Sequence, residues 1–156
     1  MKFLSSFTAS LMLGVATMAV VVAPQAEAKK EKKSKAPKVK PSKAFVPLYQ
    51  DGLKQIEAGN AAGVENAAAA MKAAIGNADD SYLLGNFYLS AGNKLKNPQM
   101  LIQGIDLLLA SDKLTDEQRQ IYHFQKGAQA FNGLKDYKQA AQSFEKAYEL
   151  GLRRGD

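Results

Sequence analysis

Apolar residues recur at steps of three and four from residue 44 to the end of the chain, and this spacing constrains the fold more than any other feature of the sequence. Such steps place side chains on one face of an α-helix, whereas the alternation typical of β-strands is hard to find here. The pattern predicts six helices, over residues 44–58, 61–75, 80–91, 98–111, 116–132 and 136–150. The fourth is apolar nearly all round, which predicts burial on several sides. The expected fold class is therefore all-α.

The ends of these segments carry residues that start or stop helices. Gly59-Asn60 tolerates the left-handed backbone conformation found at helix ends. Asn97-Pro98 and Thr115–Gln118 are N-terminal signals, the first a capping side chain followed by proline and the second a capping box. Asp79 or Asp80 is expected to cap the third helix. The short connections indicate that the six helices pair as three hairpins.

The third predicted pair combines small and aromatic residues in an ordered way. Phe124, Ala128 and Phe131 fall on one face of its first helix, and Ala140, Phe144 and Ala147 fall on one face of its second. Small residues let two helices approach closely, while aromatic rings fill the space beside them. This arrangement resembles the tetratricopeptide repeat (TPR), strongly over residues 121–154. Gly127 replaces a leucine-like residue of the family pattern, which predicts looser packing at that point.

A second stretch resembles the same repeat in part. Leu84, Gly85 and Tyr88 fit its first helix, but the following segment, AGNKLKNPQM, is longer than the tight turn of the family. The resemblance implies that residues 44–156 form three antiparallel helix hairpins stacked as a TPR-like right-handed solenoid.

In the tetratricopeptide family the first helix of each repeat lines a concave groove that holds a ligand. The resemblance implies these groove residues in the present chain: Asp79, Tyr82, Asn86, Leu89, Tyr122, Gln125, Gln129 and Asn132. Tyrosine and amide side chains bond to a peptide backbone and add contact area at small entropic cost. The family's carboxylate clamp is not reproduced, because Tyr82 stands where a lysine is needed. The expected function is a non-catalytic scaffold that binds a peptide or helix of a partner protein. The alternative is that these polar side chains simply face water.

The amino end has the features of a secretory signal peptide over residues 1–28. Lys2 precedes an apolar run from Leu11 to Ala23, and Ala26-Glu27-Ala28 provides the small-x-small pattern of a cleavage site. We expect a periplasmic or secreted protein of the bacterial envelope, cleaved near Ala28. The lysines after this site favour retention on the cytoplasmic side, so an uncleaved membrane anchor is the alternative.

Residues 29–43 form a predicted lysine-rich tether that accounts for the basic character of the chain. The net charge is +6, and eight lysines lie in this segment: Lys29, Lys30, Lys32, Lys33, Lys35, Lys38, Lys40 and Lys43. The composition predicts disorder and extension. The tether is either a solubilising spacer or an electrostatic attachment to anionic lipid or lipopolysaccharide, and the latter is the alternative function of the protein. Nucleic acid is an unlikely partner, since no aromatic residue interleaves the lysines.

The sequence offers little for catalysis or metal binding. It has no cysteine and a single histidine, His123, so a metal site has too few of the usual ligands. A nucleophile with an adjacent base and a phosphate-binding glycine motif are not found either. We therefore expect neither an enzyme nor a cofactor. Tyr148, Leu150 and Leu152, near the end of the third pair, either fold back onto it or stay partly exposed and support weak self-association or partner contact.

Overall fold

The structure is a computed structural model, and it describes residues 37–154, with side chains up to Gly151. Within that range the chain forms six α-helices, one π-helical segment and no strand, which confirms the all-α class. The helices are α1 (Phe45–Glu57), α2 (Ala61–Ala73), α3 (Ala78–Leu95), α4 (Pro98–Leu109), α5 (Asp116–Ala128) and α6 (Tyr137–Arg154), and the π-helical segment η1 (Gln129–Leu134) continues α5. The predicted signal peptide and residues 29–36 of the tether lie outside the described residues.

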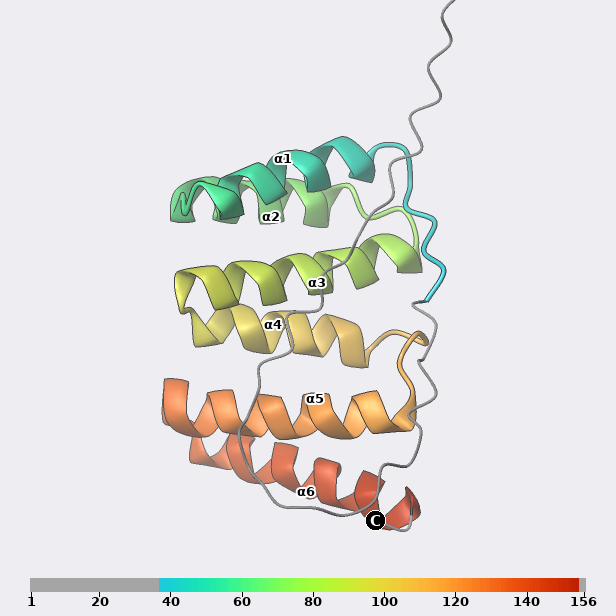
Figure 1. The fold of residues 1–156 in the computed structure, drawn as a ribbon, viewed down its shortest axis with the longest axis vertical. Coiled ribbons are helices and arrows are strands. Elements are labelled where there is room, and N and C mark those ends of the chain that lie inside the picture. Colours follow the sequence, from blue (N-terminus) through green and yellow to red (C-terminus); the bar gives the residue numbers. More distant parts are fainter. Residues whose placement is uncertain (1–36, 155–156) are drawn as a thin grey trace, which may run out of the picture. The chain divides into compact units, whose positions relative to one another are not determined.

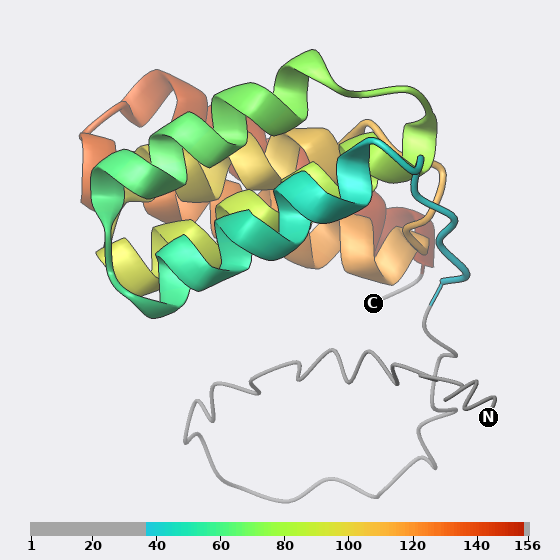
Figure 2. The ribbon, with the colours of Figure 1, turned by 90° about the horizontal axis from the view of Figure 1, so that it is seen from above.

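Consecutive helices pack in pairs, α1 with α2, α3 with α4 and α5 with α6. Figure 1 shows the pairs following one another in chain order, and in the view from above α1 and α2 lie side by side over the later helices (Figure 2). The helix α3 joins the first two pairs because it contacts both α1 and α2. The helix α4 joins the last two because it contacts both α5 and η1.

All three pairs close through a short turn whose last two residues have the same roles, and in the first pair Ala58 precedes them. A residue in the left-handed conformation ends the first helix, and the next residue caps the second with its side chain. The left-handed residues are Gly59, Lys96 and Lys135, with φ of 67°, 55° and 59°. The caps are Asn60, Asn97 and Asp136, which accept hydrogen bonds from the N–H groups of Gly63, Met100 and Gln139. The expectation of a longer connection in the second pair is therefore wrong.

Gly92 is the reason that the connection between α3 and α4 is shorter than expected. The third helix was expected to end at residue 91, yet α3 continues to Leu95. Gly92 is buried, and a Cβ there would lie 2.7 Å from Leu101 Cγ and 2.8 Å from the Leu101 backbone nitrogen. This glycine therefore permits close packing of α3 on α4 and does not turn the chain.

The start of α3 also differs from expectation. Asn77 caps this helix by accepting the N–H of Asp80 at 2.9 Å, so neither Asp79 nor Asp80 is the capping residue. Both acids instead occupy the first turn, where the helix dipole favours negative charge.

Burial confirms the expectation for α4. Its buried residues are Met100, Ile102, Gly104, Ile105 and Leu108. Met100 belongs to the core shared by α1, α2 and α3, whereas Ile102 packs with Ala130 of η1 and Ala140 of α6. The apolar character of this helix thus arises because it lies between two clusters.

The third pair packs differently from the sequence expectation. Ala140 and Ala147 are buried, whereas Phe124 is 60% exposed and Phe131 is 48% exposed, so these two rings pack at the exposed edge of the pair, Phe124 against Phe144 at 5.4 Å. Gly127 is buried, and a Cβ on it would lie 2.6 Å from Phe144 Cε1. The ring of Phe144 thus lies directly against the backbone of α5, and the packing at Gly127 is close where loose packing was expected.

Candidate functional site

The first helix of each pair carries a partly buried tyrosine. These tyrosines are Tyr49 on α1, Tyr82 on α3 and Tyr122 on α5. Burial raises the pKa of Tyr49 and of Tyr122 above the usual tyrosine value, and the electrostatic influence of Tyr82 raises each pKa further. Tyr82 thus affects the pKa of both other tyrosines. We name these residues the tyrosine row.

Aromatic contacts hold the first member of the row. The ring of Tyr49 stacks on Phe45 with centroids 6.1 Å apart and meets the edge of Phe87 at 6.4 Å. Both phenylalanines are fully buried. The sequence analysis missed Tyr49 because the first pair lacks the repeat motif. An aromatic residue on each first helix was the signal that could have identified it.

The four predicted groove residues of the second pair have different surroundings. Asp79 pairs with Lys113 across 2.7 Å. The Asn86 side-chain amide donates to the carbonyl of Tyr82 at 3.0 Å, so part of its hydrogen-bonding capacity is used within α3. Leu89 packs on α4, where a Cβ on Gly104 would lie 3.1 Å from Leu89 Cδ2. Tyr82 is the member of this set that interacts with the other tyrosines.

The predicted groove residues of the third pair lie on two segments. Tyr122 is partly buried and Gln125 is exposed, and both belong to α5. Gln129 is partly buried and Asn132 is exposed, and both belong to η1. Because a π-helical turn holds more residues than an α-helical turn, η1 shifts Gln129 and Asn132 around the helix relative to the first two. Of these four residues, Tyr122 is the one whose pKa Tyr82 raises.

A short segment before α1 lies against the start of α3, and we name residues 37–43 the strap. The N–H of Lys40 donates to Asp79 Oδ2 at 2.6 Å, and the N–H of Ser42 donates to Asp80 Oδ1 at 2.8 Å. The Asn77 amide donates to the carbonyl of Lys40 at 3.3 Å. These seven residues were assigned to the disordered tether, whereas the structure holds them on the helical domain.

The two acids that hold the strap are stabilised as carboxylates. Hydrogen bonds from Lys113 and from the N–H of Lys40 lower the pKa of Asp79. Asp80 is fully buried, and burial alone would raise its pKa, but the N–H groups of Gly76 and Ser42 together lower it. Both carboxyl groups are therefore charged at neutral pH and act as fixed acceptors for the strap.

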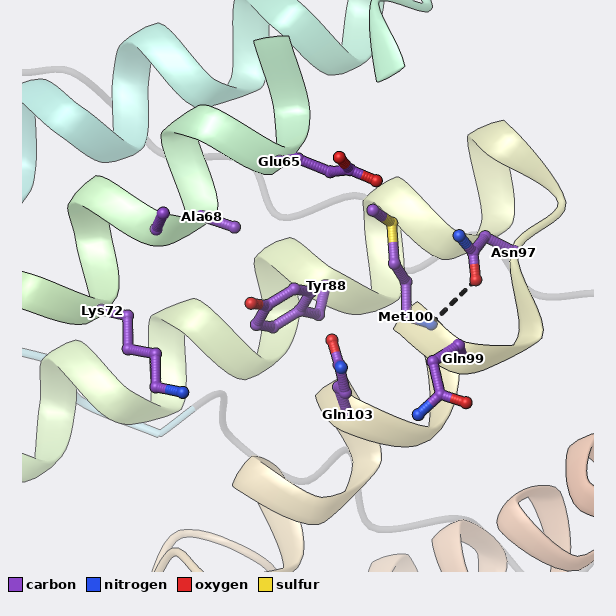
Figure 3. A pocket seen from close by; sticks show the side chains of 9 residues that line it. Glu65, Ala68, Lys72, Tyr88, Asn97, Gln99, Met100 and Gln103 are labelled. Atoms are coloured by element: carbon purple, nitrogen blue, oxygen red, sulfur yellow. Dashed lines mark hydrogen bonds between the residues drawn. The ribbon is translucent and has the colours of Figure 1, made fainter. Parts of the chain in front are cut away.

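A pocket on another side of the domain was not expected from the sequence. It has a volume of about 350 Å³ and lies between α2 and α4, with Tyr88 of α3 at its base (Figure 3). Ala68 and Met100 supply apolar surface, while Glu65, Lys72 and Gln103 surround it (Figure 3). Burial raises the pKa of Tyr88, which keeps its hydroxyl protonated. These three polar residues lie on helix faces where polar side chains are usual, so the sequence gives no signal of a pocket.

The described residues contain no cluster of three or more histidine, cysteine, aspartate or glutamate side chains that could hold a metal ion. Burial, followed by the charge of Lys126, lowers the pKa of His123. Among residues 37–154, none of the helices has the combination of length and apolar character needed to cross a membrane.

The chain matches no family model, no curated protein and no solved structure. Its resemblance to the tetratricopeptide repeat is therefore carried by its own residues alone.

Proposed function

We propose that this protein is a non-catalytic protein-interaction module whose helix pairs are antiparallel hairpins stacked as a TPR-like right-handed solenoid. The pairwise packing, the order of the pairs along the chain and the repeated turn at Gly59, Lys96 and Lys135 support this arrangement. In such a stack each pair buries its apolar face against the next one, as α4 does between the two core clusters.

The tyrosine row is the observation that carries the proposed function. Its three residues come from the first helix of every pair, so a peptide lying across α1, α3 and α5 would meet a tyrosine at each step. Tyrosine offers a large, rigid ring together with a hydroxyl that can donate or accept a hydrogen bond. Gln125, exposed and three residues after Tyr122 on α5, extends the polar surface beside it. The proposed ligand is an extended peptide or a helix of a partner protein, bound by main-chain hydrogen bonds and apolar anchors.

The proposed location is the periplasm or the outside of the cell after cleavage near Ala28. The alternative function, attachment to an anionic surface through the lysine-rich segment, differs in its salt dependence. Screening at high ionic strength weakens attraction between exposed charges but has little effect on a partly buried tyrosine contact.

Selection of peptides from a random display library on the purified protein tests the proposal. We expect selected peptides to bind at least about tenfold more weakly to the triple variant Tyr49→Phe/Tyr82→Phe/Tyr122→Phe, since each lost hydroxyl hydrogen bond is worth about 1 kcal/mol. Tyr148→Phe is the matched control, because Tyr148 is 67% exposed and lies outside the tyrosine row. Equal affinity for the triple variant, or loss of all binding at high salt, would refute the role of the row.

A further inference from the structure

Exposed apolar side chains are concentrated at one end of the helical domain. In the described part of the chain seven large apolar side chains are exposed, and six of them lie on α5, η1 and α6; Ile75 is the exception. The most exposed are Phe124 at 60%, Tyr137 at 59% and Tyr148 at 67%. The helix α6 contacts only α5 and η1 among the described elements, so no further helix of this part covers it.

These side chains form two neighbouring stripes. Ile121 and Phe124 lie three residues apart on α5, and Phe131 lies on η1. On α6, Tyr137, Ala141, Phe144 and Tyr148 recur at steps of four, three and four. Two ring contacts join the stripes, Phe124 with Phe144 at 5.4 Å and Phe131 with Tyr137 at 5.3 Å. We name these seven residues the end face.

We propose that the end face binds a second copy of this chain through a two-fold, antiparallel contact between the two α6 helices. The spacing of the α6 stripe is the same in both directions, so two antiparallel copies can align it residue by residue. An axis between residues 142 and 143 places Tyr137 opposite Tyr148 of the second copy. The same axis places the exposed Ala141 at the level of Phe144 of the second copy, whose ring packs on α5 of its own chain.

Charges beside the stripe agree with the antiparallel direction. Lys138, Gln142, Glu145 and Glu149 follow the same steps of four, three and four, and all four are exposed. The two-fold contact brings Lys138 close to Glu149 of the second copy, although Glu149 also pairs with Lys146 of its own helix at 2.8 Å.

The exposed area indicates a weak dimer. With about 200 Å² for each free side chain, the exposed fractions of Ile121, Phe124, Phe131, Tyr137 and Tyr148 correspond to about 550 Å² per copy. Both copies together would bury about 1,100 Å², which is at the lower limit for specific interfaces. We therefore expect a dissociation constant of about 10 to 100 µM.

The end face is separate from the proposed peptide site. Its α5 residues are displaced by one position, about 100° around the helix, from Tyr122 and Gln125. The dimer and the tyrosine row can thus succeed or fail independently.

Sedimentation velocity of the purified protein, from low micromolar to about 1 mM, tests the proposal. We expect the weight-average sedimentation coefficient to rise toward that of a dimer, and the rise to be absent in Tyr148→Glu and in Phe124→Glu. Ile75→Glu is the matched control and should dimerise like the original chain, because Ile75 is 37% exposed but lies outside the end face. Far-UV circular dichroism establishes that each variant folds. A monomer at every concentration, or dimers that persist in both end-face variants, would overturn the proposal.

The direction of the contact has its own test. The chain contains no cysteine, so only introduced thiols can form disulfides. When Tyr137→Cys and Tyr148→Cys proteins are mixed and oxidised, we expect mostly mixed disulfides between the two variants. An Ala69→Cys protein, carrying its thiol on the exposed side of α2, controls for random collision. Predominant disulfides between identical variants would exclude the antiparallel contact.

Discussion

The buried carboxylate of Asp80 is predicted to determine both the stability of the domain and the position of the strap. It accepts the N–H of Ser42 at 2.8 Å and the N–H of Gly76 at 2.9 Å. In Asp80→Asn the amide oxygen can accept one of these N–H groups, but the NH₂ group then faces the other. One hydrogen bond is therefore lost, and the remaining one no longer has a charged acceptor.

The expected loss follows from these contacts. Because both hydrogen bonds are only partly buried, we use the lower end of the range for a charged acceptor, about 1.5 kcal/mol. Removing a negative charge from the first turn of α3 contributes about 0.5 kcal/mol more. The sum of about 2 kcal/mol is a considerable part of the 5 to 15 kcal/mol that stabilises a typical domain.

Urea unfolding measures this loss. A midpoint shift of about 1 M is expected, since such domains lose about 1 to 3 kcal/mol of stability per molar urea. Asp112→Asn is the matched control, because its side chain is 86% exposed and should change stability by less than about 0.5 kcal/mol. Hydrogen exchange at the N–H of Ser42 should accelerate in Asp80→Asn alone.

The pH dependence provides a second readout of the same variant. The folded state lowers the pKa of Asp80, so its stabilising contribution is present above the ordinary carboxyl pKa of about 4 and is lost as the pH falls through the lowered value. The original chain and Asp80→Asn should therefore converge in stability in acid. Equal urea midpoints at neutral pH, or a difference that persists unchanged in acid, would refute the reasoning.

Three further predictions concern single positions. Lys135 has φ of 59°, a left-handed conformation that glycine adopts at lower cost, so Lys135→Gly should stabilise the domain by about 1 kcal/mol in thermal unfolding. The control Gln142→Gly, within α6, should destabilise the domain by a similar amount. A loss of stability in Lys135→Gly would contradict the turn geometry. Gly104→Ala should lower the stability of the domain by about 2 kcal/mol or more, because the new Cβ would lie 2.7 Å from the backbone oxygen of Gly85. An unchanged melting temperature would show that α3 and α4 do not approach so closely. The nuclear magnetic resonance signal of His123 should titrate with a midpoint below about 6.5, because burial and then Lys126 lower its pKa, and a higher midpoint would place this side chain in solvent.

Helix positions could be predicted where a cap determines the boundary. Asn60, Asn97 and Thr115 each accept an N–H from their own helix, and the predicted starts at residues 61, 98 and 116 agree with the structure. These signals are local, so a single sequence contains them. The all-α class follows from the same local periodicity.

Features that depend on packing could not be predicted. In the sequence Gly92 resembles a helix breaker, and Gly127 predicts loose packing. In the structure each glycine allows a side chain of the facing helix to approach the backbone. Whether a glycine turns the chain or admits a neighbour depends on that neighbour, which local sequence does not identify. The strap was missed for a related reason, because its composition predicts disorder whereas Asp79 and Asp80 supply acceptors from a distant part of the chain.

Candidate binding residues depend on register and on neighbours. Tyr82 and Tyr122 could be selected through the repeat spacing, but Tyr49 lies in a pair without the motif. The spacing also gave no sign that η1 would interrupt the α-helical register before Gln129 and Asn132. The pocket beside Tyr88 arises from side chains on three helices and has no local pattern at all.

The strap also determines how the domain would respond to mechanical force. Tension applied at Pro37 reaches Lys40 and Ser42 before it reaches α1, because both precede Phe45 in the chain. Their hydrogen bonds transmit the load to Asp79 and Asp80 on α3, a helix that contacts α1, α2 and α4. A pull on the amino end is thus borne first by the middle of the fold, and α1 is peeled away only after two carboxylate contacts have broken.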